Sequence, residues 1–419
     1  EMGIEFSCVA GTSVGALNGA LIVQDEIDKA YSLWHDIKPS MVIDFSEDEA
    51  SEDENSSKES KSKFGTLKKL QRIIKERGID INPLIELVNI NLDEEKIRKS
   101  DMEFGLVAVD LTDRKPLELY KEDIPEGKLA DYILASASLP GFKLKYIDGK
   151  IFMDGGLYNT LPINMVKNKG IKDIIVIRTF GYGRIRKIDT TGLNIVEISP
   201  VENLGPILDF RSDLARKNLK LGYFDAVKAI KKLKGTRYYI EPVNDEGFFL
   251  KHLMKLSDDK IKKISRIMGV KDVRGKRGLF EFIIPQIADL AGIPKTSSYE
   301  DVSIEVLERL ANALNIERFR IYTIKEFISA VLDEYENSKD KLKASYIMEG
   351  SIKEGSRKEG SMEEDNIREA IPKLSLKRDK PAKDKLISLV AIELLNGIKA
   401  GFGAGNPVAV NMDSGEIVL

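Results

Sequence analysis

The feature that most constrains the fold of this chain is a serine at the junction of an apolar strand and a helix rich in small residues. Residues Ile4–Ala10 have the composition of a strand, and Ser13 follows them in the segment GTSVG. Apolar residues then recur at helical spacing from residue 16 to residue 34, with a break expected near Gln24. A strand, a tight glycine turn and a helix in this order are typical of an α/β sheet.

The G-x-S-x-G pattern is compatible with two roles for Ser13. At a sharp strand-to-helix turn the hydroxyl projects from the edge of the sheet, where a serine can act as a nucleophile. Gly11 and Gly15 then allow the tight turn and the close approach of helix to strand, and the Val14 amide becomes an oxyanion donor. In the other role, Ser13 only caps the helix. The strand before it and the helix after it favour the nucleophile.

Strand and helix patterns alternate between residues 84 and 180. Phe104–Val109 and Ile174–Ile177 are apolar enough to be buried on both faces of a sheet. Between them, the pair Asp148-Gly149 separates two apolar runs, which is a strong signal for a hairpin. This alternation predicts an α/β fold with a three-layer core, in which helices flank a sheet.

Changes in composition divide the chain into regions. Residues 46–63 contain no large apolar side chain, so we expect a disordered insert there. Residues 350–364 form a short polar repeat that is typical of a linker. The boundaries that we predict are 1–235 for the α/β domain, 236–345 for a mostly helical C-terminal region, 346–384 for a flexible linker, and 385–419 for a terminal helix and tail.

Composition argues against several classes of function. The 65 Lys and Arg residues nearly balance the 68 Asp and Glu residues, and a net charge of −3 is not that of a globally basic nucleic-acid binder. One cysteine excludes an intrachain disulfide and a multi-cysteine metal site, and two histidines argue against a histidine-rich metal site. The longest apolar run, near residues 386–395, is too short to span a bilayer.

A second candidate residue follows the predicted hairpin. Asp154 stands at the end of the second hairpin strand, before Gly155 and Gly156, which leave room around it. A serine hydroxyl needs a base to accept its proton, and a carboxylate can serve as that base. Taken alone, an Asp-Gly-Gly sequence is more often a plain turn.

Together, the two motifs resemble those of the patatin-like phospholipase family, in which a serine in G-x-S-x-G pairs with an aspartate in D-G-G or D-G-A. Residues 135–140, ASASLP, look like the family's A-S-x-x-x-P loop, and residues 104–110 resemble its central strand. Residues 198–230 look like the helix at the end of the catalytic domain in bacterial members. The likeness covers residues 1–235, and the helical remainder resembles an extension of some bacterial members.

The resemblance implies a lipid acyl hydrolase with a Ser-Asp dyad. Ser13 would attack the ester carbonyl, Asp154 would act as the general base, and water would clear the acyl-enzyme. Gly155, Gly156 and Pro140 would line the site, and no metal or cofactor would be needed. The matching expectations are a lipid ester substrate, peripheral contact with a membrane surface, no nucleic-acid partner and a cytoplasmic location. The acyl chain, the head group and the oligomeric state stay open.

One part of the family pattern is absent from the sequence. Family members have a glycine-rich G-G-G-x-[KR]-G loop before the nucleophile strand, and its amides form much of the oxyanion hole. No such run precedes Ser13. We therefore expect an N-terminally truncated copy that lacks the first strand and the glycine loop and is weakly active.

Two other functions stay open at this point. Ser13, Asp154 and His252 follow the chain order of an α/β-hydrolase triad, although His252 lies in a helical pattern and catalytic histidines of that fold lie on loops. The second alternative is a catalytically inactive lipid- or protein-binding module of the same fold. A basic helix with an apolar stripe, predicted at 67–77, fits either contact with a phospholipid surface or packing on its own domain.

Overall fold

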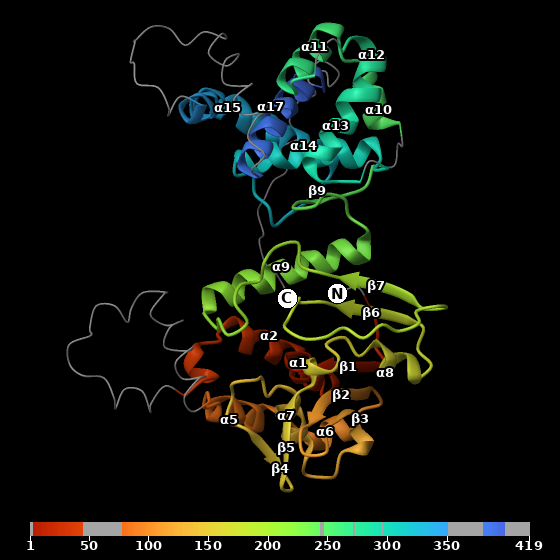
Figure 1. Cartoon of the computed structure of the whole chain (residues 1–419), viewed down its shortest axis with the longest axis vertical. Coiled ribbons are helices and arrows are strands. Elements are labelled where there is room, and N and C mark those ends of the chain that lie inside the picture. The colour runs from red at the N-terminus through yellow and green to blue at the C-terminus, as the bar shows by residue number, and fades with distance from the viewer. Residues whose placement is uncertain are drawn as a thin grey trace, which may run out of the picture. The chain divides into compact units, whose positions relative to one another are not determined.

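The computed structural model describes residues 3–44, 78–243, 247–270, 273–294, 296–350 and 380–398. Contacts divide the chain into two compact units, Glu1–Ile230 and Lys231–Leu419 (Figure 1). The insert predicted at 46–63, the helix predicted at 67–77 and the tail after residue 398 lie outside the described residues. Ser13 and Asp154 both belong to the first unit.

The first unit contains a mixed five-stranded sheet, a separate pair of parallel strands, and helices. The strands are β1 (Cys8–Thr12), β2 (Glu103–Asp110), β3 (Lys115–Tyr120), β4 (Lys145–Ile147), β5 (Lys150–Asp154), β6 (Asp173–Ile177) and β7 (Asn194–Ile198). The α-helices are α1 (Val14–Val23), α2 (Ile27–His35), α5 (Asn82–Asn91), α6 (Glu94–Lys99), α7 (Leu129–Ser136), α8 (Ile163–Asn168) and α9 (Ser212–Lys231). Short 3-10 helices are η1 (Pro39–Met41), η2 (Lys121–Asp123) and η3 (Gly155–Leu157).

The central strand of the five-stranded sheet is β2. β1 pairs with β2 in parallel, β3 and β5 pair with it in antiparallel fashion, and β4 pairs with β5. β2 is buried along most of its length, as the apolar run Phe104–Val109 predicted.

β1 and β5 lie end to end along the same side of β2. β3 pairs with residues 105–110 of β2, and these residues also pair with β1 or with β5. Because each strand has two edges, β3 must occupy the other edge of β2. The last residue of β1, Thr12, pairs with Val107, and β1 runs parallel to β2. The last residue of β5, Asp154, pairs with Ala108, and β5 runs antiparallel to β2. The C-terminal ends of β1 and β5 therefore meet at one point of the sheet.

Helices cover both faces of this sheet. A Cβ atom on Gly19 of α1 would lie 3.0 Å from Val9 and 3.2 Å from Phe104, so α1 packs on the face that these two side chains share. A Cβ atom on the next residue of β2, Gly105, would lie 2.8 Å from Met165 of α8. Successive residues of a strand point to opposite faces, so α1 and α8 lie on opposite faces. The three-layer α/β core predicted from the sequence is confirmed.

The predicted hairpin is confirmed, and the predicted first strand is corrected. β4 and β5 are joined by Asp148 and Gly149, whose φ angles of 50° and 78° are the left-handed conformations that a tight hairpin turn requires. The first strand was expected over Ile4–Ala10, but β1 covers Cys8–Thr12, because its pairing with β2 begins opposite Glu103. The strand therefore runs directly into the turn.

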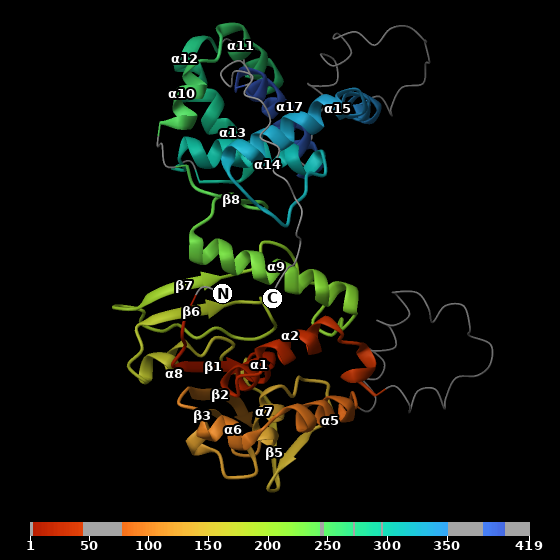
Figure 2. The same ribbon diagram turned by 180° about the vertical axis from the view of Figure 1, so that it is seen from behind.

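β6 and β7 form a parallel pair, and α9 lies alongside them in two opposite views (Figures 1 and 2). Ile174 and Val176 of β6 are buried, but Ile177 is 64% exposed. The expectation that residues 174–177 are buried on both faces is therefore wrong. Among the described strands β6 pairs only with β7, so the rest of the sheet does not enclose it.

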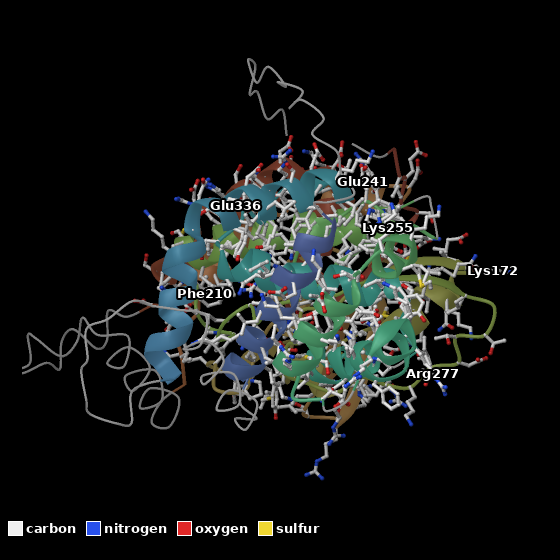
Figure 3. All side chains as sticks on the ribbon, turned by 90° about the horizontal axis from the view of Figure 1, so that it is seen from above. Lys172, Phe210, Glu241, Lys255, Arg277 and Glu336 are labelled. Atoms are coloured by element: carbon white, nitrogen blue, oxygen red, sulfur yellow. The ribbon has the colours of Figure 1, made fainter. Side chains whose placement is uncertain are left out.

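The second unit is built of helices around one apolar core. Its helices are α10 (Phe248–Met254), α11 (Asp258–Ile267), α12 (Gly275–Gly278), the π-helix η4 (Leu279–Ile283), α13 (Ile284–Ala291), α14 (Tyr299–Ala313), α15 (Ile324–Gly350) and α17 (Lys380–Ile398). Two short parallel strands are β8 (Tyr239–Ile240) and β9 (Ile321–Tyr322). On its surface, Arg277 forms an exposed ion pair with Glu281. Figure 3 labels Arg277, whose side chain points outward.

The helices near the predicted linker differ from expectation. α15 continues to Gly350, past residue 345, where the helical region was expected to end, and α17 begins at Lys380, before residue 385. α17 also belongs to the core of the second unit, where it contacts α11, α13 and α14. A helix with apolar residues on every side is stable only when it is buried. None of the helices in the described ranges has the length and hydropathy of a membrane span.

Candidate active site

Ser13 lies at the turn between β1 and α1 in an unusual backbone conformation. Its φ of 59° and ψ of −127° are rare for a residue with a side chain. Such a conformation costs about 1–3 kcal/mol and persists only where the surrounding structure holds it. The Ser13 side chain makes no capping hydrogen bond to α1. The alternative in which Ser13 merely caps the helix is therefore wrong.

The two glycines of the turn differ in the space around them. A Cβ atom on Gly11 would lie 2.1 Å from the carbonyl oxygen of Gly15, so only glycine fits at position 11. A Cβ atom on Gly15 would meet no described atom within 4 Å, and the φ of Gly15 is not in the left-handed region. The steric requirement that we predicted for both glycines therefore applies to Gly11 alone.

Asp154 is followed by a glycine that has no room for a side chain. A Cβ atom on Gly155 would lie 2.1 Å from the carbonyl oxygen of Val107 and 3.0 Å from the Thr12 side chain. This crowding follows from the topology, because β1 and β5 end at adjacent positions of β2. Gly155 therefore allows the ends of the two strands to approach, which places Ser13 beside Asp154.

The C-terminal end of α7 and the residues after it hold both turns in position. The Ser136 hydroxyl accepts a 2.9 Å hydrogen bond from the Ser13 amide and donates one of 2.6 Å to the carbonyl of Val107. The Ser138 carbonyl accepts a 2.8 Å hydrogen bond from the Asp154 amide. Both serines are buried. Sequence reasoning assigned them no role, since their partners lie on other elements; their place in the ASASLP segment was the only signal.

Two further hydrogen bonds connect the two turns through Asn159. The Thr12 hydroxyl donates a 2.8 Å hydrogen bond to the carbonyl of Asn159. The Asn159 amide in turn donates a 2.9 Å hydrogen bond to the carbonyl of Gly155. Asn159 is fully buried. The segment after Asp154 thus folds back against the end of β1, which fixes the position of the carboxyl relative to Ser13.

Asp154 is a buried carboxyl with one paired oxygen. It is 3% exposed, and its Oδ1 accepts a 2.7 Å hydrogen bond from the Gly156 amide. Its Oδ2 is buried and has no hydrogen-bond partner among the described residues. Burial raises the pKa of Asp154, while the nearby Ser13 side chain and the Gly156 amide lower that pKa in part. The Ser13 side chain therefore lies near enough to the carboxyl to affect its pKa, while Oδ2 keeps its hydrogen-bonding capacity.

We expect Asp154→Asn to be at least as stable as the unchanged chain at pH 7. Its free energy of unfolding should be equal or higher, by up to about 1–3 kcal/mol. Because the pKa of Asp154 is raised in the folded state, its contribution to stability is present at acid pH and is lost as pH rises through that raised pKa. Asparagine keeps an oxygen for the Gly156 amide and removes the buried charge. Urea unfolding at pH 7 and pH 3 measures the difference, which should shrink at pH 3. A marked destabilisation at pH 7 would contradict this account.

Val14 and Pro140, the remaining predicted site residues, have different surroundings. Val14 is the first residue of α1, so its amide has no partner within the helix. The Val14 side chain is 40% exposed, and the amide beside Ser13 stays a candidate oxyanion donor. Pro140 is exposed, and no described contact joins it to Ser13 or Asp154. Its place in the site lining therefore stays a prediction.

His252, the third member of the alternative triad, belongs to α10 in the second unit. Its Nδ1 lies 2.7 Å from the carbonyl oxygen of Phe248 in the same helix, and the two rings are 4.5 Å apart. These are the surroundings of a packed helical residue. In the described ranges no group of three or more His, Cys, Asp or Glu residues is arranged to hold a metal ion.

The comparison with known families concerns the same part of the chain. A family model described as Patatin-like phospholipase matches residues 1–167. This range contains Ser13, Asp154 and all the strands of the five-stranded sheet. The resemblance that the two motifs suggested is confirmed for these residues, and it supports lipid acyl hydrolase activity in general.

Proposed function

We propose, since residues 1–167 belong to the patatin-like phospholipase family, that this chain hydrolyses carboxylic esters of lipids through an acyl-enzyme on Ser13. The observation that carries the proposal is the meeting of β1 and β5 on β2, which brings Ser13 beside Asp154. A serine and a base at one place are the parts that two-step ester hydrolysis requires. The strained turn at Ser13 and the buried carboxyl of Asp154 are the second support, because such features cluster at active sites.

In the first step, the Ser13 Oγ attacks the ester carbonyl carbon and its proton passes to Asp154. The Oδ2 atom of Asp154 is the natural acceptor, because Oδ1 already binds the Gly156 amide. The tetrahedral intermediate then loses the alcohol, to which Asp154 returns the proton. In the second step, a water molecule gives a proton to Asp154 and attacks the acyl group. The carboxylic acid leaves, and the proton returns to Ser13.

Burial helps Asp154 to act as this base. A carboxyl whose pKa is raised by burial is a stronger base than an exposed aspartate. As pH falls, kcat/KM should therefore decline with an apparent pKa above the range of an ordinary aspartate.

The start of α1 supplies charge stabilisation for the tetrahedral intermediate. Amides in the first turn of a helix have no intrahelical partner, and the helix dipole makes this end positive. The Val14 amide is the donor next to Ser13 along the chain. One such donor contributes on the order of 10²–10³ in rate.

The proposal is tested with the full chain, a phospholipid in mixed micelles and a short-chain nitrophenyl ester. We expect release of fatty acid and of nitrophenol from the unchanged chain and none above background from Ser13→Ala. The matched control is Ser32→Ala, which removes an exposed hydroxyl from α2 and should retain the rate. Release that Ser13→Ala leaves unchanged, or no release from either substrate, would overturn the proposal. The second result would favour the inactive binding module.

We expect His252→Ala to retain kcat within about tenfold of the unchanged chain. The His252 ring is bonded to the carbonyl of its own helix, and the proposed proton transfers involve Asp154 alone. Damage to a true triad member lowers kcat by about 10⁴-fold. Steady-state rates on the nitrophenyl ester decide between the two. A loss of that larger size would establish the α/β-hydrolase triad instead.

A further inference from the structure

The segment between β6 and β7 returns to the candidate active site. Residues 178–187, which we call the 178–187 loop, have the sequence RTFGYGRIRK. The Arg184 amide donates a 2.9 Å hydrogen bond to the carbonyl of Gly156, and the Thr160 amide donates one of 2.7 Å to the carbonyl of Arg184. Gly156 is two residues from Asp154, so the backbone of the loop is fixed beside the proposed base.

A glycine in the loop permits this contact. Gly183 has a φ of 143°, and a Cβ atom there would lie 2.4 Å from the carbonyl oxygen of Gly156. The loop therefore approaches the Asp154 turn through its backbone.

Three apolar side chains of the loop are exposed to solvent. Phe180 is 63% exposed, Tyr182 is 68% exposed and Ile185 is 54% exposed. Single exposed apolar residues are common and need no explanation. Three within one short loop that is anchored to the Asp154 turn are a candidate contact surface.

The loop also carries three cations that lack a carboxylate partner. Arg184, Arg186 and Lys187 are exposed, and none of them forms an ion pair with any residue in the described ranges. The Arg186 guanidinium lies 4.4 Å from the centre of the Tyr158 ring, so it is positioned by a cation-π contact and remains unneutralised. The exposed surface of the loop therefore combines apolar groups with uncompensated positive charge.

We propose that the 178–187 loop docks the first unit onto an anionic phospholipid surface. Tyrosine is enriched at the interface between lipid and water, where Tyr182 would lie. Phe180 and Ile185 would enter the boundary between head groups and acyl chains. The cations of the loop would meet the phosphate groups, to which basic residues near a bilayer are attracted. This inference rests on the proposed function, because docking through the loop holds the Ser13–Asp154 site at the surface that contains the lipid ester.

The chemistry of the loop favours a lipid surface over a nucleic acid. Single-stranded nucleic acids are bound in long positive grooves with several stacking platforms, and the whole chain has a net charge of −3. A few exposed apolar side chains beside a few cations match the depth and charge of a bilayer interface instead.

The first experiment tests the apolar side chains. Binding of the full chain to vesicles of phosphatidylglycerol and phosphatidylcholine is measured by sedimentation. We expect at least tenfold weaker binding for the triple variant Phe180→Ala, Tyr182→Ala and Ile185→Ala. The matched control also removes three exposed apolar side chains from the same unit and should bind like the unchanged chain; it combines Ile90→Ala, Leu144→Ala and Tyr146→Ala.

The second experiment tests the charges. We expect Arg184→Gln with Lys187→Gln to bind the anionic vesicles about 30-fold more weakly. The difference should vanish in 1 M salt, which screens the attraction. The matched control is Arg114→Gln with Lys325→Gln, two exposed cations that also lack an ion pair among the described residues. Substitution of side chains leaves the backbone contacts of the loop intact, and circular dichroism checks the fold of each variant.

The outcomes separate this inference from the proposed function. Ser13→Ala should bind vesicles like the unchanged chain, so vesicle binding without ester hydrolysis would count against the proposed function alone. Equal binding by the loop variants and the unchanged chain, or equal losses in the matched controls, would overturn the docking proposal. So would loop variants that lose binding to a single-stranded oligonucleotide while their vesicle binding is unchanged.

Discussion

Asp154→Asn is expected to lower kcat for ester hydrolysis about 10⁴-fold, and Ser13→Ala is expected to lower it by at least as much. Asparagine can still accept the hydrogen bond from the Gly156 amide, but it cannot take the proton of Ser13. The Asp154→Asn variant therefore keeps the arrangement of the turn and loses the proposed base. Rates on a nitrophenyl ester, with binding measured separately, check the result.

The double variant of Ser13→Ala and Asp154→Asn should be little worse than either single variant. Two residues that act as one unit do not contribute independently, so the second loss removes nothing further. Because Asp154→Asn is expected to be at least as stable as the unchanged chain, unfolding would not explain its inactivity. Full activity in Asp154→Asn would show that another group accepts the proton.

Gly11→Ala is expected to destabilise the first unit by about 3 kcal/mol or more, and Gly15→Ala to change its stability by about 1 kcal/mol or less. The new methyl group at position 11 would lie 2.1 Å from a backbone carbonyl, so either the turn or α1 must move. The methyl group at position 15 meets nothing described, and alanine favours a helix. Thermal or urea unfolding of the two variants measures the contrast.

The rates of ester hydrolysis of the two glycine variants should differ in the same direction as their stabilities. Gly11→Ala displaces the Ser13 turn and is expected to lose most activity, while Gly15→Ala should retain it. Equal stabilities for the two variants would mean that the G-x-S-x-G turn relaxes easily. The strain at Ser13 would then not depend on the close approach at Gly11.

The two motifs were predictable because each is local in sequence. The turn at Ser13 follows from one strand, one glycine and one helix, and the left-handed Asp148-Gly149 pair marks the hairpin that leads to Asp154. The family resemblance then joined the two motifs. That Ser13 and Asp154 meet was beyond local reasoning, because it depends on the register of β1 and β5 along β2.

Contacts between distant elements account for what sequence reasoning missed. Ser136 and Ser138 hold the two turns through hydrogen bonds to other elements. Their place in the ASASLP segment was the one local sign of a role, and it did not show which groups they bind. Gly11 and Gly15 are identical in the pattern, but only the structure shows which one faces a carbonyl. The return of Arg184 to Gly156 is equally non-local, and no pattern in residues 178–187 predicted it.

The start of the helix α17 was predicted incorrectly. The apolar run near residue 390 predicted a helix, but the polar residues before it concealed its start at Lys380. The apolar residues between 386 and 395 are explained by burial in the core of the second unit. Burial of α17 depends on the helices that pack against it, and the sequence of the segment alone does not identify them.

The most direct test of the central claim is to trap the nucleophile. The full chain is treated with a fluorophosphonate, which phosphonylates an activated serine, and the modified residue is identified by peptide mass spectrometry. The account predicts a single modified serine, Ser13, and at least a hundredfold slower modification in Asp154→Asn. Modification of a different serine, or modification of Ser13 at the same rate without the Asp154 carboxylate, would contradict it.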